Sequence, residues 1–292
     1  MANLIDLRRR IRSVKNTQQI TKAMKMVAAS KLRRAQERVI AARPYARTLE
    51  ATLASLAGRV PESADGAAPH PLLERREEKS VVVVVVTGDK GLCGGFNANV
   101  LRTATPFLAG LKAKGIEDVR LVLLGRKGVD FYRRRPVSVL DSRPGIFQRF
   151  DYGTGAEIAR ALAARFVAGE CDAVYAIYNE FRSVIAQVVR TKRILPLELP
   201  AAAGGEGSDF LYEPAPDVIL GRLVPRHLEF QLYSILLESN AAEQGARMTA
   251  MDGASKNAGD VIDSLSLIYN RARQARITKE LIEIVSGAAA LD

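Results

Sequence analysis

An apolar repeat runs through the first 57 residues, which contain no glycine and a single proline, Pro44. Thirteen of the sixteen positions in this repeat are apolar. A repeat of this length, spaced every 3.5 residues, predicts a helix that packs against another helix as a left-handed coiled coil. Pro44 should bend this helix near Arg43, because it removes one backbone donor. The repeat positions are Leu4, Leu7, Ile11, Val14, Gln18, Thr21, Lys25, Ala28, Leu32, Ala35, Val39, Ala42, Ala46, Leu49, Leu53 and Leu56.

A second long helix is predicted from Pro225, the last proline, to Asp292. Its first apolar series comprises Leu228, Leu232, Ile235, Ala242 and Ala246, and its second comprises Met251, Ala254, Ala258, Val261, Leu265, Ile268, Ala272, Ala275 and Ile282. The series are offset by one residue near Gly245, Gly253 and Gly259, each of which weakens a helix by about 1 kcal/mol relative to alanine. Because both terminal helices have one apolar face to bury, the simplest arrangement pairs them antiparallel.

The middle of the chain alternates strand and helix signals. This alternation predicts a largely parallel sheet covered by helices. The predicted strands are Ser80–Thr87, Arg120–Gly125, Val137–Leu140, Ala173–Asn179 and Ser183–Thr191, the helices Asn97–Lys114, Lys127–Arg134 and Thr154–Ala168, and the loops Arg59–Lys79 and Pro196–Pro216. The predicted fold class is therefore α/β: an antiparallel coiled coil of long N- and C-terminal helices plus a central Rossmann-like α/β domain, divided as residues 1–57, 58–225 and 226–292.

The net charge of +11 is concentrated at the N-terminus. Residues 1–57 hold thirteen Lys and Arg against three Asp and Glu, whereas residues 226–292 hold seven against nine. A basic helix of this kind suits nucleic acid, an anionic membrane or an acidic protein surface, or it is simply solvated. A nucleic-acid-binding coiled coil should also be basic on its partner helix, which carries a net charge of −2.

Metal sites and covalent catalysis have few candidate residues. The chain has two cysteines, Cys93 and Cys171, and two histidines, His70 and His227, so no cluster has metal-ligand spacing. A reducing compartment fits this cysteine usage best. We expect no membrane span, since the longest strictly apolar run is Val81 to Val86, and no signal peptide. The Arg-rich, acid-poor start leaves a transit peptide as an alternative.

A glycine-rich segment, GDKGLCGG, follows the first predicted strand and precedes a helix. Rossmann-like domains bind phosphates at this place, but the spacing matches neither G-x-G-x-x-G nor a P-loop. We therefore predict a structural turn that presents Asp89, Lys90 and Cys93, with a nucleotide site as the alternative. Cys93 is expected to be a small, partly buried residue, although a thiol near a helix N-terminus can also be reactive. The four glycines are Gly88, Gly91, Gly94 and Gly95.

Polar residues interrupt the N-terminal repeat at Gln18, Thr21 and Lys25. Such residues usually set the register of a coiled coil, but they also arise where a helix turns toward another partner. Met24 lies in this interruption as core or as a partner contact. The C-terminal helix carries a comparable group of polar residues, which form either a solvated face or a contact surface.

Several motifs together resemble the γ subunits of F-type ATP synthases of the bacterial type. The characteristic segments are ITKAMKMVAASKLRRAQ from Ile20, RPY at Arg43 to Tyr45, TGDKGLCGGFN from Thr87, LYEP from Leu211 and the run from Tyr269 to Ala290. They occur in the family's order and at similar spacing, so the resemblance spans the whole chain. The middle domain has no extra cysteine-bearing insert of the chloroplast type, so thiol regulation is not expected.

The resemblance implies a non-catalytic subunit without a cofactor. Such a subunit is a central rotary shaft that couples rotation of the membrane ring to conformational changes in the catalytic β subunits, and that influences ATPase activity and proton flow. The implied partners are three α and three β subunits around the coiled coil, and the ring of c subunits and ε at the α/β domain. The implied location is the cytoplasmic face of the cell membrane, reached only through the complex, and no nucleic acid is involved.

By the same resemblance, eight residues match positions that contact the β subunits or couple rotation to catalysis. Cys93 would lie near an acidic helical loop of β. The eight are Met24, Cys93, Arg247, Arg273, Gln274, Thr278, Glu280 and Glu283.

Overall fold

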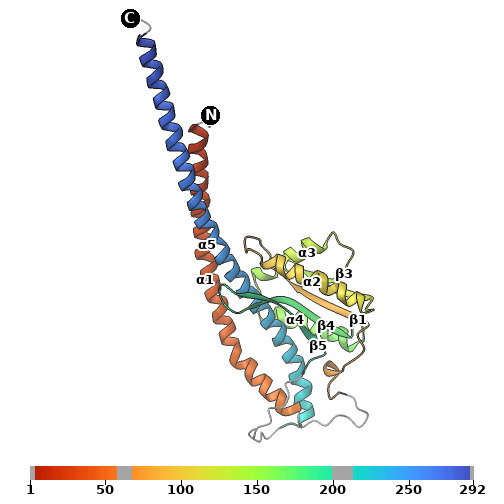
Figure 1. Cartoon of the computed structure of the whole chain (residues 1–292). Helices are drawn as coiled ribbons and strands as arrows, with labels where there is room; N and C mark the ends of the chain where they lie inside the picture. Colours follow the sequence, from red (N-terminus) through yellow and green to blue (C-terminus); the bar gives the residue numbers. More distant parts are fainter. Residues whose placement is uncertain (1–3, 58–67, 199–212, 290–292) are drawn as a thin grey trace. The chain divides into compact units, whose positions relative to one another are not determined.

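The computed structural model describes residues 4–57, 68–198 and 213–289 (Figure 1). The chain divides into two compact units. The helical unit comprises residues 1–29 and 247–292, and the α/β unit comprises residues 30–246. The predicted loops Arg59–Lys79 and Pro196–Pro216, and the LYEP motif, lie partly outside the described residues. The division into residues 1–57, 58–225 and 226–292 stays a prediction.

Two long helices form the ends of the chain. Helix α1 spans Leu4–Ala57 and helix α5 spans Pro216–Ala289, and each continues through an internal proline, Pro44 or Pro225. Helix α5 thus begins nine residues before the predicted start at Pro225. Pro216 occupies the first turn, where a proline has no backbone hydrogen bond to lose. Pro225 removes one backbone hydrogen bond, but the helix continues because its packing against the rest of the unit outweighs that loss.

The helical unit is an antiparallel coiled coil, as predicted. Arg8 donates a hydrogen bond to the Tyr269 hydroxyl at 2.7 Å, and Lys25 forms an ion pair with Asp252 at 2.6 Å. Residue numbers therefore rise along α1 as they fall along α5. All sixteen predicted repeat positions of α1 are buried or half-buried, which confirms the register of this helix.

The second apolar series of α5 is only half correct. Met251, Ala254, Ala258, Leu265 and Ala272 are buried or half-buried, but so are Ser255, Ile262 and Tyr269, and Ser255 and Tyr269 form hydrogen bonds with α1. Both alternatives keep the 3.5-residue spacing, and the polar contacts of Ser255 and Tyr269 with α1 decide between them. The predicted positions that are exposed instead are Val261, Ile268, Ala275 and Ile282.

A five-stranded sheet forms the centre of the α/β unit, in the order β3-β2-β1-β4-β5. The pairs β1–β2, β1–β4 and β2–β3 are parallel, and β4–β5 is antiparallel, so the predicted, largely parallel sheet is confirmed. The strands are β1 Ser80–Val86, β2 Asp118–Leu124, β3 Ser138–Arg143, β4 Ala173–Phe181 and β5 Gln187–Leu195.

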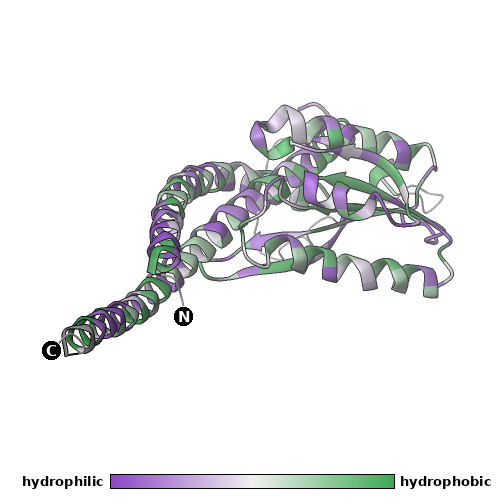
Figure 2. Cartoon of the chain, turned by 90° about the horizontal axis from the view of Figure 1, so that it is seen from above, coloured by the Kyte–Doolittle hydropathy of each residue, from purple (hydrophilic) through white to green (hydrophobic). Residues whose placement is uncertain are grey.

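Helices cover both faces of this sheet (Figure 2). Alternate valines of β1 face opposite sides, because successive side chains of a strand point to opposite faces. Val81, Val83 and Val85 pack with residues of α2, and Val82, Val84 and Val86 pack with α4, α5 and the end of α1. The helices are α2 Phe96–Ala113, α3 Arg126–Tyr132 and α4 Tyr152–Val167, with short 3₁₀ turns at Pro71–Leu73 and Ile146–Gln148.

The last strand starts later than predicted. Residues 183–186 form a tight turn, in which the Ser183 and Ala186 backbones exchange hydrogen bonds of 3.1 and 3.3 Å, and β5 begins only at Gln187. The turn carries Val184 and Ile185 at its tip and contains no glycine or asparagine. Two apolar residues at a turn imitate the start of a strand, which is why the sequence pattern placed the strand four residues early.

Candidate functional site

The C-terminal part of α5 has no helix packed against it among the described residues. Tyr269 and Ala272 are the last half-buried residues, and every residue from Arg273 to Ser286 is exposed. Within the helical unit, Figure 1 shows α5 continuing past the described end of α1. The predicted contact residues on this segment are therefore all at the surface: Arg273, Gln274, Thr278, Glu280 and Glu283.

Several charged side chains of this segment form ion pairs with one another within the helix. Arg276 and Glu280 approach to 2.8 Å, and Lys279 and Glu283 to 3.5 Å, each four residues apart. Such exposed pairs contribute about 0.3–0.5 kcal/mol, so a partner can exchange them for its own contacts at little cost. Gln274 and Thr278 are also four residues apart and share one face.

The polar interruption of α1 faces α5. Gln18 donates to the backbone carbonyl of Ser255 at 3.3 Å, and Lys25 binds Asp252, whose pKa is lowered by that hydrogen bond and by Lys256. Thr21 is buried. These contacts support the interpretation that the polar residues set the register of the coiled coil. Met24, next to Lys25, is half-buried.

The basic side chains of α1 are almost all exposed. Of the thirteen Lys and Arg of this helix, only Lys25 is not exposed. Arg247 on α5 is half-buried. The charge excess read from the sequence is therefore a surface property, available to an acidic partner.

The glycine-rich segment forms a turn that is tied to the rest of the α/β unit by Asp89. Its carboxylate accepts hydrogen bonds from the backbone N–H groups of Arg126, Gly145 and Phe147, at 2.9, 2.6 and 2.9 Å. The prediction that the turn presents Asp89 is wrong, because these three donors hold the carboxylate inside, and only Lys90 of the named polar residues is exposed.

A neighbouring glycine is required for steric reasons. Gly125 has a φ of +96°, and a Cβ at this position would lie 1.9 Å from the backbone oxygen of Thr87. No side chain fits there, so β1 and the start of α3 can approach this closely only with glycine.

The space where a Rossmann-like domain would hold a phosphate is occupied by α5. A Cβ built on Gly88 would lie 3.0 Å from the carboxyl carbon of Glu243, a buried residue of that helix. A carboxylate in this place repels a phosphate group. This geometry favours a structural turn over the nucleotide-binding alternative.

Cys93 is buried, with 2% of its surface exposed, and packs with Phe96, Ala242 and Ala246. Cys93 is thus a small residue that is buried more fully than expected, and the turn does not present it at the surface, because these apolar neighbours enclose it. Leu92 beside it is 62% exposed and has a φ of +63°, a conformation that costs energy in residues other than glycine. A partner of this turn would thus touch Lys90 and Leu92 rather than the thiol.

Sequence reasoning missed that several large apolar side chains of the coiled coil are exposed. Val261, Leu267 and Ile268 are exposed on α5, and Ile20, Met26 and Val27 on α1. The repeat pattern predicts Val261 and Ile268 in the seam, whereas both are exposed and thus available to a partner. The signal that could have identified these exposed residues is the excess of apolar residues over those that one seam can bury.

The structure places the predicted contact residues in both units. Met24, Arg247 and the residues from Arg273 to Glu283 belong to the helical unit, and Cys93 belongs to the α/β unit. In the described part of the chain, no three His, Cys, Asp or Glu side chains are grouped so as to hold a metal ion. No helix formed by residues 4–57, 68–198 or 213–289 is long and apolar enough to cross a membrane.

Residues 3–291 match the model of the family described as ATP synthase. The ATP synthase gamma chain of Chlorobium luteolum is 51% identical to this chain, over 100% of this chain and 99% of the relative. The chain belongs to the ATP synthase gamma chain family. The gamma chain of Solibacter usitatus is also 51% identical, over the full length of both chains.

Solved structures agree with this family. A chain of the Tetrahymena thermophila mitochondrial ATP synthase, from a structure of the central stalk and c-ring, is 25% identical, with a TM-score of 0.61, over 81% of this chain and 99% of that chain. A chain from the Euglena gracilis mitochondrial enzyme has a TM-score of 0.68 over 99% of this chain and 94% of its own, and at 17% identity it shows the fold alone.

Membership of the gamma chain family confirms the resemblance stated from the motifs. The structure and its solved relatives confirm the fold class predicted from the apolar repeats and the alternation of strands and helices. It also supports the role of a non-catalytic central shaft in ATP synthesis and ion transport, associated with the ATP synthase complex. The eight predicted contact residues are not tested by these likenesses and remain predictions.

Proposed function

We propose that this chain is the central rotary shaft of an F-type ATP synthase. One observation carries the proposal: in a gamma-chain family member, α5 from Arg273 to Ser286 is a single helix exposed on every side, with apolar residues among its charged ones. A single helix with exposed apolar residues needs a partner that surrounds it. A sleeve formed by three α and three β subunits is such a partner.

The other partners follow from the resemblance and from the assemblies of the structural relatives. The α/β unit would contact the ring of c subunits and bind ε, and the relatives' structures contain a c-ring beside their own rotor chains. Membrane association through the complex, at the cytoplasmic face of the cell membrane, belongs to the same proposal. Nucleic acid has no part in it.

The exposed basic side chains of α1 give the shaft a means of holding its partners loosely. Exposed ion pairs contribute only about 0–1 kcal/mol each, so basic side chains attract an acidic sleeve without locking one orientation. Because the two helices carry different side chains, each β subunit would meet a different face. Each orientation would then stabilise a different nucleotide-affinity state through the difference in contact energy.

The required free energy is moderate. Raising the population of one nucleotide-affinity state at a catalytic site from about 1% to about 99% takes about 5.5 kcal/mol. Several weak contacts spread over the eight predicted residues can supply this amount. For the buried Cys93, the contact would be made by the exposed neighbours in its turn.

The test replaces Gln274 and Thr278 together with alanine in the complex reconstituted from this chain and its α and β partners. Alanine favours helix, so the helix should persist, while two polar contacts with the sleeve are lost. Each is worth roughly 0.5–1.5 kcal/mol, so steady-state ATP hydrolysis should fall by about fivefold to a hundredfold.

A matched control changes the exposed Gln148 and Thr105 of the α/β unit to alanine, and turnover should stay within about twofold of the wild type. Circular dichroism and assembly yield are measured on the same samples. Unchanged turnover in the Gln274/Thr278 variant would mean that this face is only solvated. Lost helicity or failed assembly would show a structural role instead.

A further inference from the structure

Two large apolar side chains are exposed on neighbouring turns of the α/β unit. Ile185, at the tip of the hairpin between β4 and β5, is 84% exposed, and Leu92, in the glycine-rich turn after β1, is 62% exposed. Tight turns favour glycine, asparagine, aspartate and proline, so neither turn needs a large apolar side chain for its own conformation. Leu92 also has a φ of +63°, a conformation that costs energy and that persists mainly at binding sites and other functional positions.

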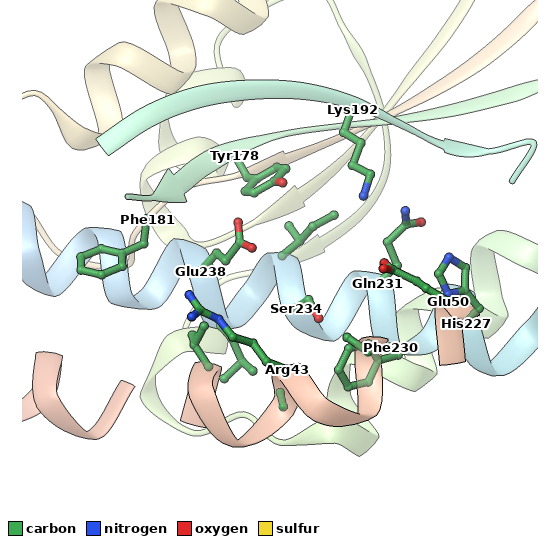
Figure 3. Close-up of a pocket in the computed structure, with 15 residues that line it drawn as sticks. Arg43, Glu50, Tyr178, Phe181, Lys192, His227, Phe230, Gln231, Ser234 and Glu238 are labelled. Atoms are coloured by element: carbon green, nitrogen blue, oxygen red, sulfur yellow. The ribbon is translucent and has the colours of Figure 1, made fainter. Parts of the chain in front are cut away.

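Both turns are held on α5 by one small core cluster. Cys93, which follows Leu92, packs with Ala246 of α5 in this cluster, and Phe181, at the end of β4, packs against it from the hairpin (Figure 3). The ring of Phe181 would lie 3.4 Å from a Cβ built on Gly245, the residue before Ala246. The two exposed tips are therefore supported by neighbouring positions of the same helix.

Hydrogen bonds fix the backbone of both turns. In the glycine-rich turn, Asn97 accepts a hydrogen bond from the Gly88 N–H at 2.7 Å and donates one to the Lys90 carbonyl at 3.3 Å. In the hairpin, the side chain of Gln187 donates to the Val184 carbonyl at 2.8 Å. A partner that binds such preformed turns does not have to order them first, so little conformational entropy is lost on binding.

Exposed basic side chains surround the two tips. Lys90 lies in the glycine-rich turn, Arg182 lies in the hairpin, and Arg126 and Lys127 begin α3, whose first backbone N–H groups are hydrogen-bonded to the glycine-rich turn. Within the described ranges, Lys90, Arg126 and Lys127 have no acidic partner. Their positive charges are therefore available to another chain.

The acidic groups of the same region are mostly enclosed or paired. Asp89 accepts its three backbone hydrogen bonds inside the unit, and Glu180 forms ion pairs with Arg190 and Arg182 at 2.9 and 3.1 Å, which lower its pKa. Asp130, one turn along α3, is exposed. The surface around the two tips therefore combines large apolar side chains with an excess of positive charge.

We propose that residues 90–92 and 182–185 form one contact surface for an acidic segment of a partner chain, which carries large apolar side chains among its carboxylates. A helix with its side chains is about 10–12 Å wide, so one helix of the partner can lie across both tips. Its carboxylates then meet the basic side chains, and its apolar side chains cover Leu92 and Ile185. This contact rests on the proposed function, since the partner belongs to the assembled complex, and it adds the hairpin tip to the contact surface.

Photo-crosslinking in the complex reconstituted from this chain and its α and β partners tests the contact. The photoreactive residue p-benzoylphenylalanine replaces Ile185 in one variant, Leu92 in a second and Val167, which is 51% exposed at the end of α4, in a third. We expect the first two variants to crosslink to the same acidic segment of one partner chain, at positions within about ten residues of each other. The Val167 variant, the matched control, should not reach that segment.

The charge at the hairpin tip supplies a second test. With the crosslinker kept at Leu92, Ile185→Asp should lower the crosslinking yield by about two- to fivefold, because a carboxylate would face an acidic partner. Ile185→Lys should keep the yield within about twofold of the unsubstituted chain. Neither change should disturb folding, since Ile185 is so exposed, and circular dichroism checks this. Val167→Asp introduces the same charge at the control position and should leave the yield unchanged.

Three results would overturn the contact while leaving the shaft proposal intact. They are the absence of a partner crosslink from Ile185, a crosslink from Ile185 to a segment apart from the one that Leu92 reaches, and equal yields in Ile185→Asp and Ile185→Lys. Crosslinking to a second copy of this chain would also contradict an acidic partner segment. A chain that does not assemble with α and β at all would refute the proposed function, and this contact with it.

Discussion

Two carboxylates of the α/β unit, Asp89 and Glu238, lie in opposite environments. We expect that removing the first lowers the stability of the fold and that removing the second raises it. Asp89 accepts three backbone hydrogen bonds, whereas one oxygen of Glu238 accepts none from the described residues. Neither environment could be predicted from the sequence. Asp89 stood in a glycine-rich turn that suggested exposure, because its donors come from residues 37 to 58 positions away along the chain.

Replacing Asp89 with alanine should lower the free energy of unfolding by about 3 kcal/mol, since three partly buried backbone N–H groups would each lose a partner at roughly 1 kcal/mol. Urea denaturation of the full chain measures this difference. Asp130→Ala, at an exposed position of α3, should change it by less than about 0.5 kcal/mol. Equal losses in the two variants would show that the Asp89 contacts contribute nothing of their own.

Glu238 predicts a pH dependence of stability. Its pKa is raised in the folded state, so its contribution is most favourable below the unfolded pKa of about 4.3 and declines as pH rises through the folded pKa. Burial lowers the pKa of His227, so that residue acts in the opposite direction and costs stability as pH falls below about 6.5.

Glu238→Gln removes only the first of these effects. We expect the variant to gain stability relative to the wild type, and to gain more at pH 8 than at pH 5. Urea denaturation at both pH values tests this expectation. A gain that does not depend on pH would mean that Glu238 titrates alike in the folded and unfolded chain.

Among the elements, the two long helices were the most predictable from sequence, because many repeat positions agree over a long stretch. The register of α5 was less so. A heptad pattern permits two neighbouring sets of positions, and hydropathy favoured the set with Ala254 and Ile268 over the set with Ser255 and Tyr269. The choice depends on polar contacts with α1, such as the hydrogen bond from Arg8 to Tyr269, which no periodicity shows.

A pair of substitutions tests this register. Ile262→Ala should lower the stability of the helical unit by about 1–2 kcal/mol, because a half-buried side chain is shortened against α1. Val261, which is 45% exposed, should tolerate alanine within about 0.5 kcal/mol. Thermal unfolding followed by far-UV circular dichroism compares the two. A larger loss at Val261 would restore the register expected from hydropathy.

For the whole molecule, the fold class could be predicted from the apolar repeats at both ends and the strand–helix alternation in the centre, and the family from the motifs. The contact residues were less accessible to sequence reasoning, because a contact with another chain leaves no periodic pattern. Cys93 shows the difficulty: the motif that contains it was recognised, yet the thiol is buried and its neighbours Lys90 and Leu92 are at the surface.

Met24→Lys should impair coupling more than folding in the assembled complex. A new cation beside Lys22 and Lys25 would attract an acidic sleeve and deepen one rotational position. We expect ATP-driven ion pumping to fall severalfold more than ATP hydrolysis, when both are measured on the same membranes. Met26→Lys introduces the same charge at a position that is already well exposed, and its effect should be smaller. Equal losses of pumping and hydrolysis in Met24→Lys would contradict uncoupling.

The exposed end of α5 also bears on how the cell handles surplus copies of this chain. Ile277, Leu281 and Ile284 lie open on a helix that α1 does not accompany, and Ile282 and Val285 add to the same segment. Such residues are what chaperones and quality-control proteases recognise on unassembled proteins. We therefore expect copies made beyond the supply of their partners to be degraded or to aggregate.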